Sequence, residues 1–141
     1  MGCRFMESKK ELSLDRLKRA TDSLSSAKIL LKNKQYLGAA NRAYYCVFYC
    51  INSVFALEPI SFKKHSATIS HFHKDYIKQS KFGDDSKRLS NIITDLFEVR
   101  GSSDYEDFFD ISRQEVLEHV ENAEFFLKVI KNFLASQNIK A

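Results

Sequence analysis

The sequence predicts an all-α protein, an antiparallel four-helix bundle with one additional short helix. Apolar residues recur at steps of three and four through five segments, as they do on the buried face of a helix. Glycine and proline are scarce, with 4 and 1 residues, which leaves little material for the turns of a sheet. The 141 residues, 44% of them hydrophobic, can fill one core, and no repeat or linker divides them. We therefore expect one helical domain over residues 8–137, after a flexible N-terminus at residues 1–7.

The first two helices are expected over residues 8–33 and 36–56. Ser8 and Glu11 have the spacing of a capping box, which predicts a helix start at Ser8. A single apolar stripe follows, formed by Leu17, Ala20, Leu24, Ala27 and Leu31. The second helix is apolar nearly all round, with Ala40, Tyr44, Val47, Ile51 and Val54 on one side. It should therefore be the central helix of the bundle.

The remaining helices follow Pro59, which ends the second pattern. The third is expected from Ser61 or Phe62 to Gln79, and Lys81–Asp85 is expected to form a turn. The fourth carries a core-facing stripe of Leu89, Ile93, Leu96 and Arg100. An acidic and aromatic connection at residues 104–111 leads to the fifth helix, which opens at a second capping box, Ser112 with Glu115.

Polar side chains on two of these helices are the candidates for function. Arg100 lies on a stripe that should face the core, with Asp104 four residues later and Tyr105 beside it. Arg42, Tyr45, Tyr49 and Asn52 form one polar stripe along the central helix. Under one interpretation these groups are structural, with arginines paired to carboxylates and tyrosines packed with exposed hydroxyls. Under the other, both arginines bind phosphate in a groove, and a tyrosine stacks or donates a hydrogen bond.

The chain resembles the HEPN domain family (higher eukaryotes and prokaryotes nucleotide-binding). The resemblance is carried by Tyr36–Tyr45 with Val47 and Phe48, then Lys64-His65-Ser66, then Arg100 with Asp104 and Tyr105. It covers nearly the whole chain and points to the prokaryotic branch whose signature is arginine, three residues, aspartate and tyrosine. The resemblance implies a helical bundle that dimerises, a groove near Arg100 and pairing with a minimal nucleotidyltransferase in toxin–antitoxin modules. It also places Lys64 and His65 among the groove residues.

The sequence departs from the ribonucleases of that family at one position. Many of them carry a histidine a few residues after the arginine, where this chain has Tyr105, Glu106 and Asp107. RNA cleavage without a metal needs a proton acceptor near the 2′-hydroxyl and stabilisation of the phosphorane. Arg100 can meet the second need, but pairing with Arg100 would lower the pKa of Asp104 and make it a poor base. Any endoribonuclease activity should therefore be weak and depend on Arg100, Asp104 and Tyr105, or on His65.

Composition limits the other classes of function. The net charge of +4 permits an anionic partner but is far below that of a nucleic-acid coat protein. The first helix is basic, a pattern typical of a solvated face and less often of a nucleic-acid surface: Lys9, Lys10, Arg16, Lys18 and Arg19. Cys46 and Cys50 are one helical turn apart, but no second pair completes a metal site, so neither a metal nor another cofactor is expected. With no signal core and no apolar run of about 20 residues, we expect a cytoplasmic protein.

Three hypotheses remain open from the sequence. The first is a nucleotide- or RNA-binding HEPN component of a toxin–antitoxin module, in which Tyr105 could accept a nucleotidyl group from the partner transferase. The second is a metal-independent endoribonuclease toxin, and the third is a purely structural helical dimerisation partner. A symmetric homodimer is expected because the central helix is apolar on many faces and because Phe108, Phe109 and Ile111 add apolar surface.

Overall fold

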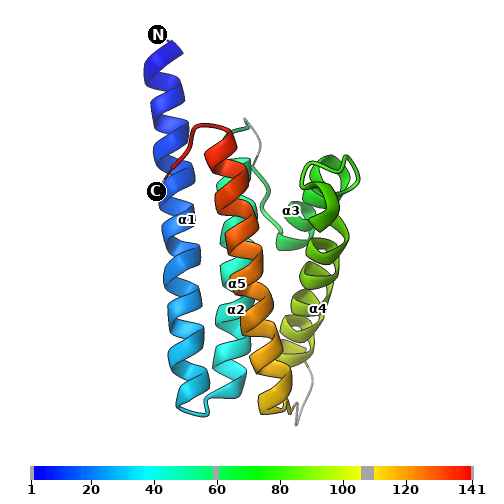
Figure 1. Ribbon diagram of the computed structural model, residues 1–141. Coiled ribbons are helices and arrows are strands. Elements are labelled where there is room, and N and C mark those ends of the chain that lie inside the picture. Colours follow the sequence, from blue (N-terminus) through cyan, green and yellow to red (C-terminus); the bar gives the residue numbers. More distant parts are fainter. Residues whose placement is uncertain (1, 59–60, 106–109, 141) are drawn as a thin grey trace.

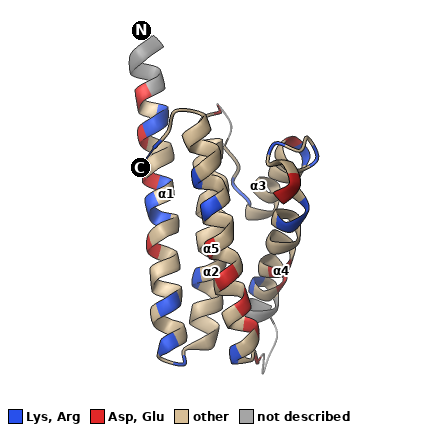
Figure 2. Ribbon diagram, viewed as in Figure 1, with Lys and Arg blue, Asp and Glu red and all other residues tan. Residues whose placement is uncertain are grey.

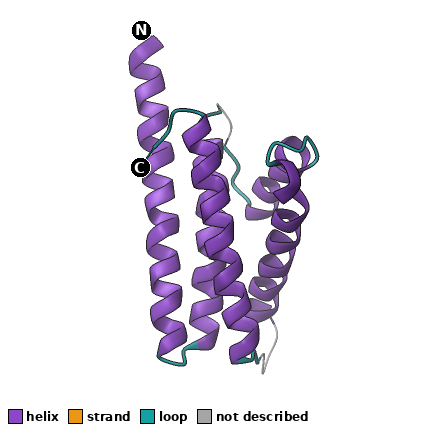
Figure 3. Ribbon diagram, viewed as in Figure 1, coloured by secondary structure: helices purple, strands orange, loops and turns teal. Residues whose placement is uncertain are grey.

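The computed structural model describes the backbone of residues 2–58, 61–105 and 110–140, and the side chains of residues 7–58, 61–101 and 110–140. Within these ranges the chain forms helices and no β-strand (Figures 1 and 3). The α-helices of the described residues are α1 (Gly2–Lys32), α2 (Tyr36–Phe55), α3 (His65–Phe72), α4 (Ser86–Tyr105) and α5 (Arg113–Ser136). The four long helices lie side by side with alternating direction, and the short α3 packs at one end. The predicted all-α bundle is confirmed.

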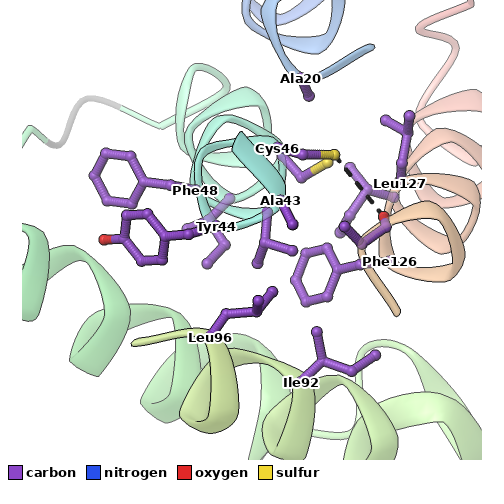
Figure 4. Packing of buried hydrophobic residues seen from close by; sticks show 14 of the residues in the cluster. Ala20, Ala43, Tyr44, Cys46, Phe48, Ile92, Leu96, Phe126 and Leu127 are labelled. Atoms are coloured by element: carbon purple, nitrogen blue, oxygen red, sulfur yellow. Dashed lines mark hydrogen bonds between the residues drawn. The ribbon is translucent and has the colours of Figure 1, made fainter. Parts of the chain in front are cut away.

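Helix α2 is the central element, because it contacts α1, α3, α4 and α5. Its buried side includes Ala43, Val54 and Ile51, none more than 1% exposed. Figure 4 shows Leu96 of α4 and Phe126 of α5 directed toward this side of α2. Small residues on α2 let the neighbouring helices approach closely, and the large side chains of those helices fill the space between them.

Three side chains of α1 bind backbone carbonyl groups at the C-terminal end of α2. Arg16 Nη1 donates to Asn52 O at 2.8 Å, and Ser13 Oγ donates to Ser53 O at 2.8 Å. Lys9 Nζ lies 3.4 Å from Leu57 O. The last carbonyl groups of a helix mostly lack partners within that helix, although Asn52 O also accepts a hydrogen bond from Ala56 N at 3.0 Å. Helix α1 therefore supplies part of the C-terminal capping of α2.

Two helix boundaries differ from those expected. Helix α1 begins at Gly2, and Ser8 lies within it rather than capping it. The third helix begins at His65 rather than at Ser61 or Phe62, and it continues after Phe72 as a π-helical turn, His73–Ile77, which ends before Gln79. The bond from Lys78 N to His73 O, 2.9 Å long, spans five residues and defines this wider turn.

The other end of the chain follows the expected pattern more closely. Helix α4 extends through Tyr105, so the backbone stays helical between Arg100 and Asp104. The N-cap of α5 at Ser112 is confirmed, since Ser112 Oγ accepts a hydrogen bond from Glu115 N at 3.1 Å, and this hydroxyl in turn donates to Glu115 Oε1 at 3.1 Å. A short 3₁₀ turn, Gly83–Asp85, precedes α4 within the expected turn.

The expected apolar surplus of α2 is largely covered within one protomer. Most apolar side chains of α2 are buried against the other helices. Ile111, expected to add exposed apolar surface, is only 6% exposed. Phe108 and Phe109 lie outside the described residues. The homodimer stays a prediction, and its argument from Ile111 is wrong because that side chain packs into the core.

Among the helices that the structure describes, none combines the length and the apolar character that crossing a membrane would require.

Candidate functional site

Arg42 and Arg100 both lie beside the ring of Tyr45. The Arg42 guanidinium carbon is 4.8 Å from the centre of this ring, and that of Arg100 is 5.9 Å from it. Arg100 also lies over Tyr44, at 5.0 Å. Arg42, Tyr45 and Arg100 are each partly buried. Helices α2 and α4 thus bring two permanent positive charges to one aromatic surface.

His65, the first residue of α3, completes this group. Its Nδ1 lies 2.8 Å from the Tyr44 hydroxyl, and its ring stacks on Phe48 with centres 3.8 Å apart. Burial, with a smaller contribution from the positive charge of Arg100, lowers the pKa of His65. Both effects favour the neutral form of the imidazole. We call Arg42, Tyr44, Tyr45, His65 and Arg100 the arginine–tyrosine cluster.

A groove of about 450 Å³ adjoins this cluster, between α1, α2 and the segment that leads into α3. We call it the α1–α2 groove. Its lining residues include Arg16, Arg19, Tyr49, Asn52, Lys63 and His65. His65 belongs to both the groove and the cluster, and Tyr49 packs against Tyr45 with ring centres 6.1 Å apart. The two features therefore form one continuous surface along α2.

The structure brings most of the sequence-predicted site residues together. Arg42, Tyr45, Tyr49, His65 and Arg100 lie along this surface. Lys64 is exposed, caps α3 through its backbone, and is not among the groove-lining residues, whereas its neighbour Lys63 is. The backbone of Asp104 and Tyr105 forms the end of α4, but their side chains lie outside the described ones.

Sequence reasoning missed three contributors. Tyr44 was assigned to the core, and it is 3% exposed, but its hydroxyl is also the partner of His65. Lys63 and Phe62 precede α3, where no helical period indicates which side chain faces a groove. The lysine pair Lys63-Lys64 was the available signal, and only the backbone conformation distinguishes its two members.

Cys46 and Cys50 behave as core residues. Both are buried, and Cys46 Sγ lies 3.9 Å from Ala123 O (dashed line in Figure 4). Burial raises the pKa of Cys50 well above its ordinary value. Among the described residues, no three side chains of the types that hold metal ions gather at one place.

Comparison with known proteins agrees with the resemblance seen in the sequence. The family model described as "HEPN domain" matches residues 13–133. The chain belongs to the HEPN domain family. The arginine–tyrosine cluster and most of the groove lie within the part of this HEPN chain that the model matches.

Relatives of this HEPN chain are found in bacteria and archaea. A UPF0332 protein of Thermotoga maritima is 32% identical over 83% of this chain and 86% of its own length. A protein of Methanocaldococcus jannaschii that carries the name "Putative toxin MJ0142" is 29% identical over 99% of this chain and 93% of its own. A second protein of that archaeon, "Putative toxin MJ0605", is 32% identical over 82% of this chain and 83% of its own.

Proposed function

We propose that this HEPN protein binds nucleotide or RNA through the arginine–tyrosine cluster, as the HEPN component of a toxin–antitoxin module. The observation that carries the proposal is the convergence of Arg42 and Arg100 on the ring of Tyr45. Guanidinium groups bind phosphate oxygens in pairs of hydrogen bonds, and aromatic rings stack on bases. The cluster offers both groups within a few ångströms.

The role in a toxin–antitoxin module is supported by the relatives. Two of them carry names that begin with "Putative toxin", and one of these aligns with nearly the full chain. The resemblance to the prokaryotic HEPN branch adds a minimal nucleotidyltransferase as the expected partner. Tyr105, at the end of α4, is our candidate acceptor of a nucleotidyl group. Such a modification would add negative charge at the end of the helix that carries Arg100 and so oppose RNA binding.

The direct test is RNA binding by variants of the two arginines. Fluorescence anisotropy with a labelled single-stranded RNA should show weakening of about ten- to a hundredfold for Arg42→Ala and for Arg100→Ala, corresponding to about 1–3 kcal/mol. Arg88→Ala is the matched control, because Arg88 is also on α4 and also lies over an aromatic ring, Phe125, at 3.6 Å. If all three variants bind RNA equally well, the cluster is not the binding site.

The transferase partnership has its own test. Incubation with a minimal nucleotidyltransferase partner and ATP should transfer AMP to the Tyr105 hydroxyl with release of pyrophosphate. This adds the mass of one nucleotidyl group to the wild-type protein and none to Tyr105→Phe. A wild-type protein of unchanged mass, or a Tyr105→Phe variant modified to the same extent, would remove Tyr105 as the acceptor.

Metal-independent RNA cleavage is the second candidate function, and one observation favours it. His65 lies within the cluster with its Nδ1 2.8 Å from the Tyr44 hydroxyl, and burial together with the charge of Arg100 lowers its pKa, which favours the neutral imidazole. A neutral histidine beside an arginine can accept the 2′-hydroxyl proton while the guanidinium stabilises the phosphorane. Cleavage should then persist with a chelator and be lost in both His65→Ala and Arg100→Ala. Cleavage that needs a metal, or that survives Arg100→Ala, excludes this mechanism.

A further inference from the structure

The α1–α2 groove gathers basic side chains from α1 and from the segment that precedes α3. Acidic residues are interspersed among groups of basic residues along α1 (Figure 2). The groove, however, is lined by Arg16, Arg19 and Lys63 against a single carboxylate, Asp15. Arg16 and Arg19 come from α1 and Lys63 from the opposite wall, so a ligand in the groove meets cations from both sides.

These cations differ in how firmly they are held. Arg16 is anchored to Asn52 O at 2.8 Å, and burial lowers its pKa. Arg19 pairs with Asp15 at 3.1 Å, but both side chains are more than half exposed. An exposed pair within one helix contributes little stability, so a phosphate can replace the carboxylate as the partner of Arg19 at small cost. Lys63 is exposed.

Aromatic rings line the same groove. Phe48, Tyr49, Phe62 and His65 are among its lining residues, and Phe62 is 36% exposed. Rings interleaved with cations are the surface that single-stranded nucleic acids use, because bases stack on the rings while phosphates lie on the cations. An acidic protein segment would use the cations but has no need of the rings.

The groove continues directly into the arginine–tyrosine cluster. Tyr49 in the groove packs on Tyr45 in the cluster, and His65 lies in both. A mononucleotide would occupy one of these places. A strand can occupy both, with adjacent phosphates on separate groups of cations.

We propose that the α1–α2 groove is a second RNA subsite, which binds the continuation of a single strand held by Arg42 and Arg100. Arg19 and Lys63 contact phosphate there, and Tyr49 and Phe62 stack on bases. This proposal rests on the proposed function. It adds that the ligand is a single strand of several nucleotides, which runs from α4 across α2 to α1.

The test compares two lengths of RNA on charge-matched variants. The double variant Arg19→Ala/Lys63→Ala removes the two exposed cations of the groove. Lys18→Ala/Lys32→Ala removes two exposed cations of α1 that are not among the groove-lining residues. A single-stranded RNA of about eight nucleotides spans both sites. A dinucleotide, used as a competitor, fills only the cluster.

The groove variant should bind the longer RNA at least tenfold more weakly than the Lys18→Ala/Lys32→Ala control. The slope of log affinity against log salt should fall by about 1.4, at about 0.7 for each lost phosphate contact. The affinity of the groove variant for the dinucleotide should match that of wild type, whereas Arg100→Ala should bind both the longer RNA and the dinucleotide more weakly.

Two results would overturn the subsite. If the groove variant and the control bind the longer RNA equally while Arg100→Ala is weakened, the strand does not enter the groove, although the proposed function stands. An acidic partner segment would then be the occupant to examine. If wild type binds neither RNA, the subsite and the proposed function fail together.

Discussion

The two faces of α2 differ in burial and in what they contact. On one side Ala43, Ile51 and Val54 are almost fully buried against neighbouring helices. On the other side the polar residues are only partly buried: Arg42 and Tyr45 belong to the cluster, and Tyr49 and Asn52 line the groove. One helix thus has a side that holds the bundle together and a side available to a ligand. Substitutions on the two sides should separate stability from binding.

The largest effect is expected on the buried side, at Phe126 of α5. Its ring is 0% exposed and lies 6.3 Å from the ring of Phe72. Phe126→Ala should lower the free energy of unfolding by about 3–5 kcal/mol, because the cavity it leaves cannot collapse fully. Guanidinium chloride denaturation measures this, and Phe126→Leu should lose less. The fraction of the variant that remains folded should bind RNA as wild type does. A decrease in the free energy of unfolding of less than about 1 kcal/mol would contradict this packing.

The next largest effect is expected on the other side, at Tyr45. Tyr45→Leu removes the ring on which Arg42 and Arg100 converge. RNA affinity should fall by about 1–3 kcal/mol, the range for one base–aromatic stack. Tyr36→Leu is the control, since Tyr36 is another partly buried tyrosine of α2 and lies outside the cluster. Equal RNA affinity in the two variants would show that the ring of Tyr45 does not contact the ligand.

A smaller effect, on the free energy of unfolding, is expected at Tyr44, which contributes both to the core and to the cluster. Its ring is buried in the core and its hydroxyl pairs with His65. Tyr44→Phe keeps the ring and leaves Nδ1 of His65 without that partner, which should cost about 0.5–1.5 kcal/mol of unfolding free energy. Thermal denaturation of Tyr44→Phe and of the control variant Tyr36→Phe measures the difference in their stabilities. No difference between the two variants would mean that water replaces the hydroxyl.

The smallest effect is a pH dependence. Burial lowers the pKa of His65, His73 and His119 in the folded state, so the unfolded chain takes up protons first as the pH falls. The free energy of unfolding should therefore decrease as the pH drops through about 6.5, and the histidine contribution should level off below the folded pKa values. Denaturation at about pH 7.5 and about pH 5.5 measures this. His65→Gln should make the decline shallower, and an unchanged decline would exclude His65 as a contributor.

Side-chain periodicity was enough to predict the helices and the central place of α2, but not their ends. Ser8 and Ser112 stand in the same capping-box spacing, and only Ser112 caps a helix. A cap forms only where the backbone before it leaves the helical conformation, as Ser112 does with ψ of 156°. No glycine or proline between Cys3 and Glu7 forces such a change before Ser8. Local spacing therefore identifies a potential cap, and the preceding backbone decides whether it is used.

The cluster was partly predictable for a related reason. Arg42 and Tyr45 lie on α2 and Arg100 lies on α4. Within each helix, steps of three and four residues determine which face a side chain occupies. Lys63 and Lys64 stand before α3, where no such period applies, and Lys63 rather than Lys64 lines the groove. The double role of Tyr44 depends on α3 bringing His65 to its hydroxyl, a contact across 21 residues that spacing alone does not reveal.

The bonds from Lys9, Ser13 and Arg16 to the end of α2 have a consequence for the entropy of binding. They hold two walls of the groove in register before any ligand arrives. A strand that enters the groove therefore loses its own freedom without also having to order the protein, and this smaller entropic cost favours affinity. The same bonds oppose fraying of the last turn of α2. Its backbone amides should exchange with deuterium more slowly than those of an ordinary helix end.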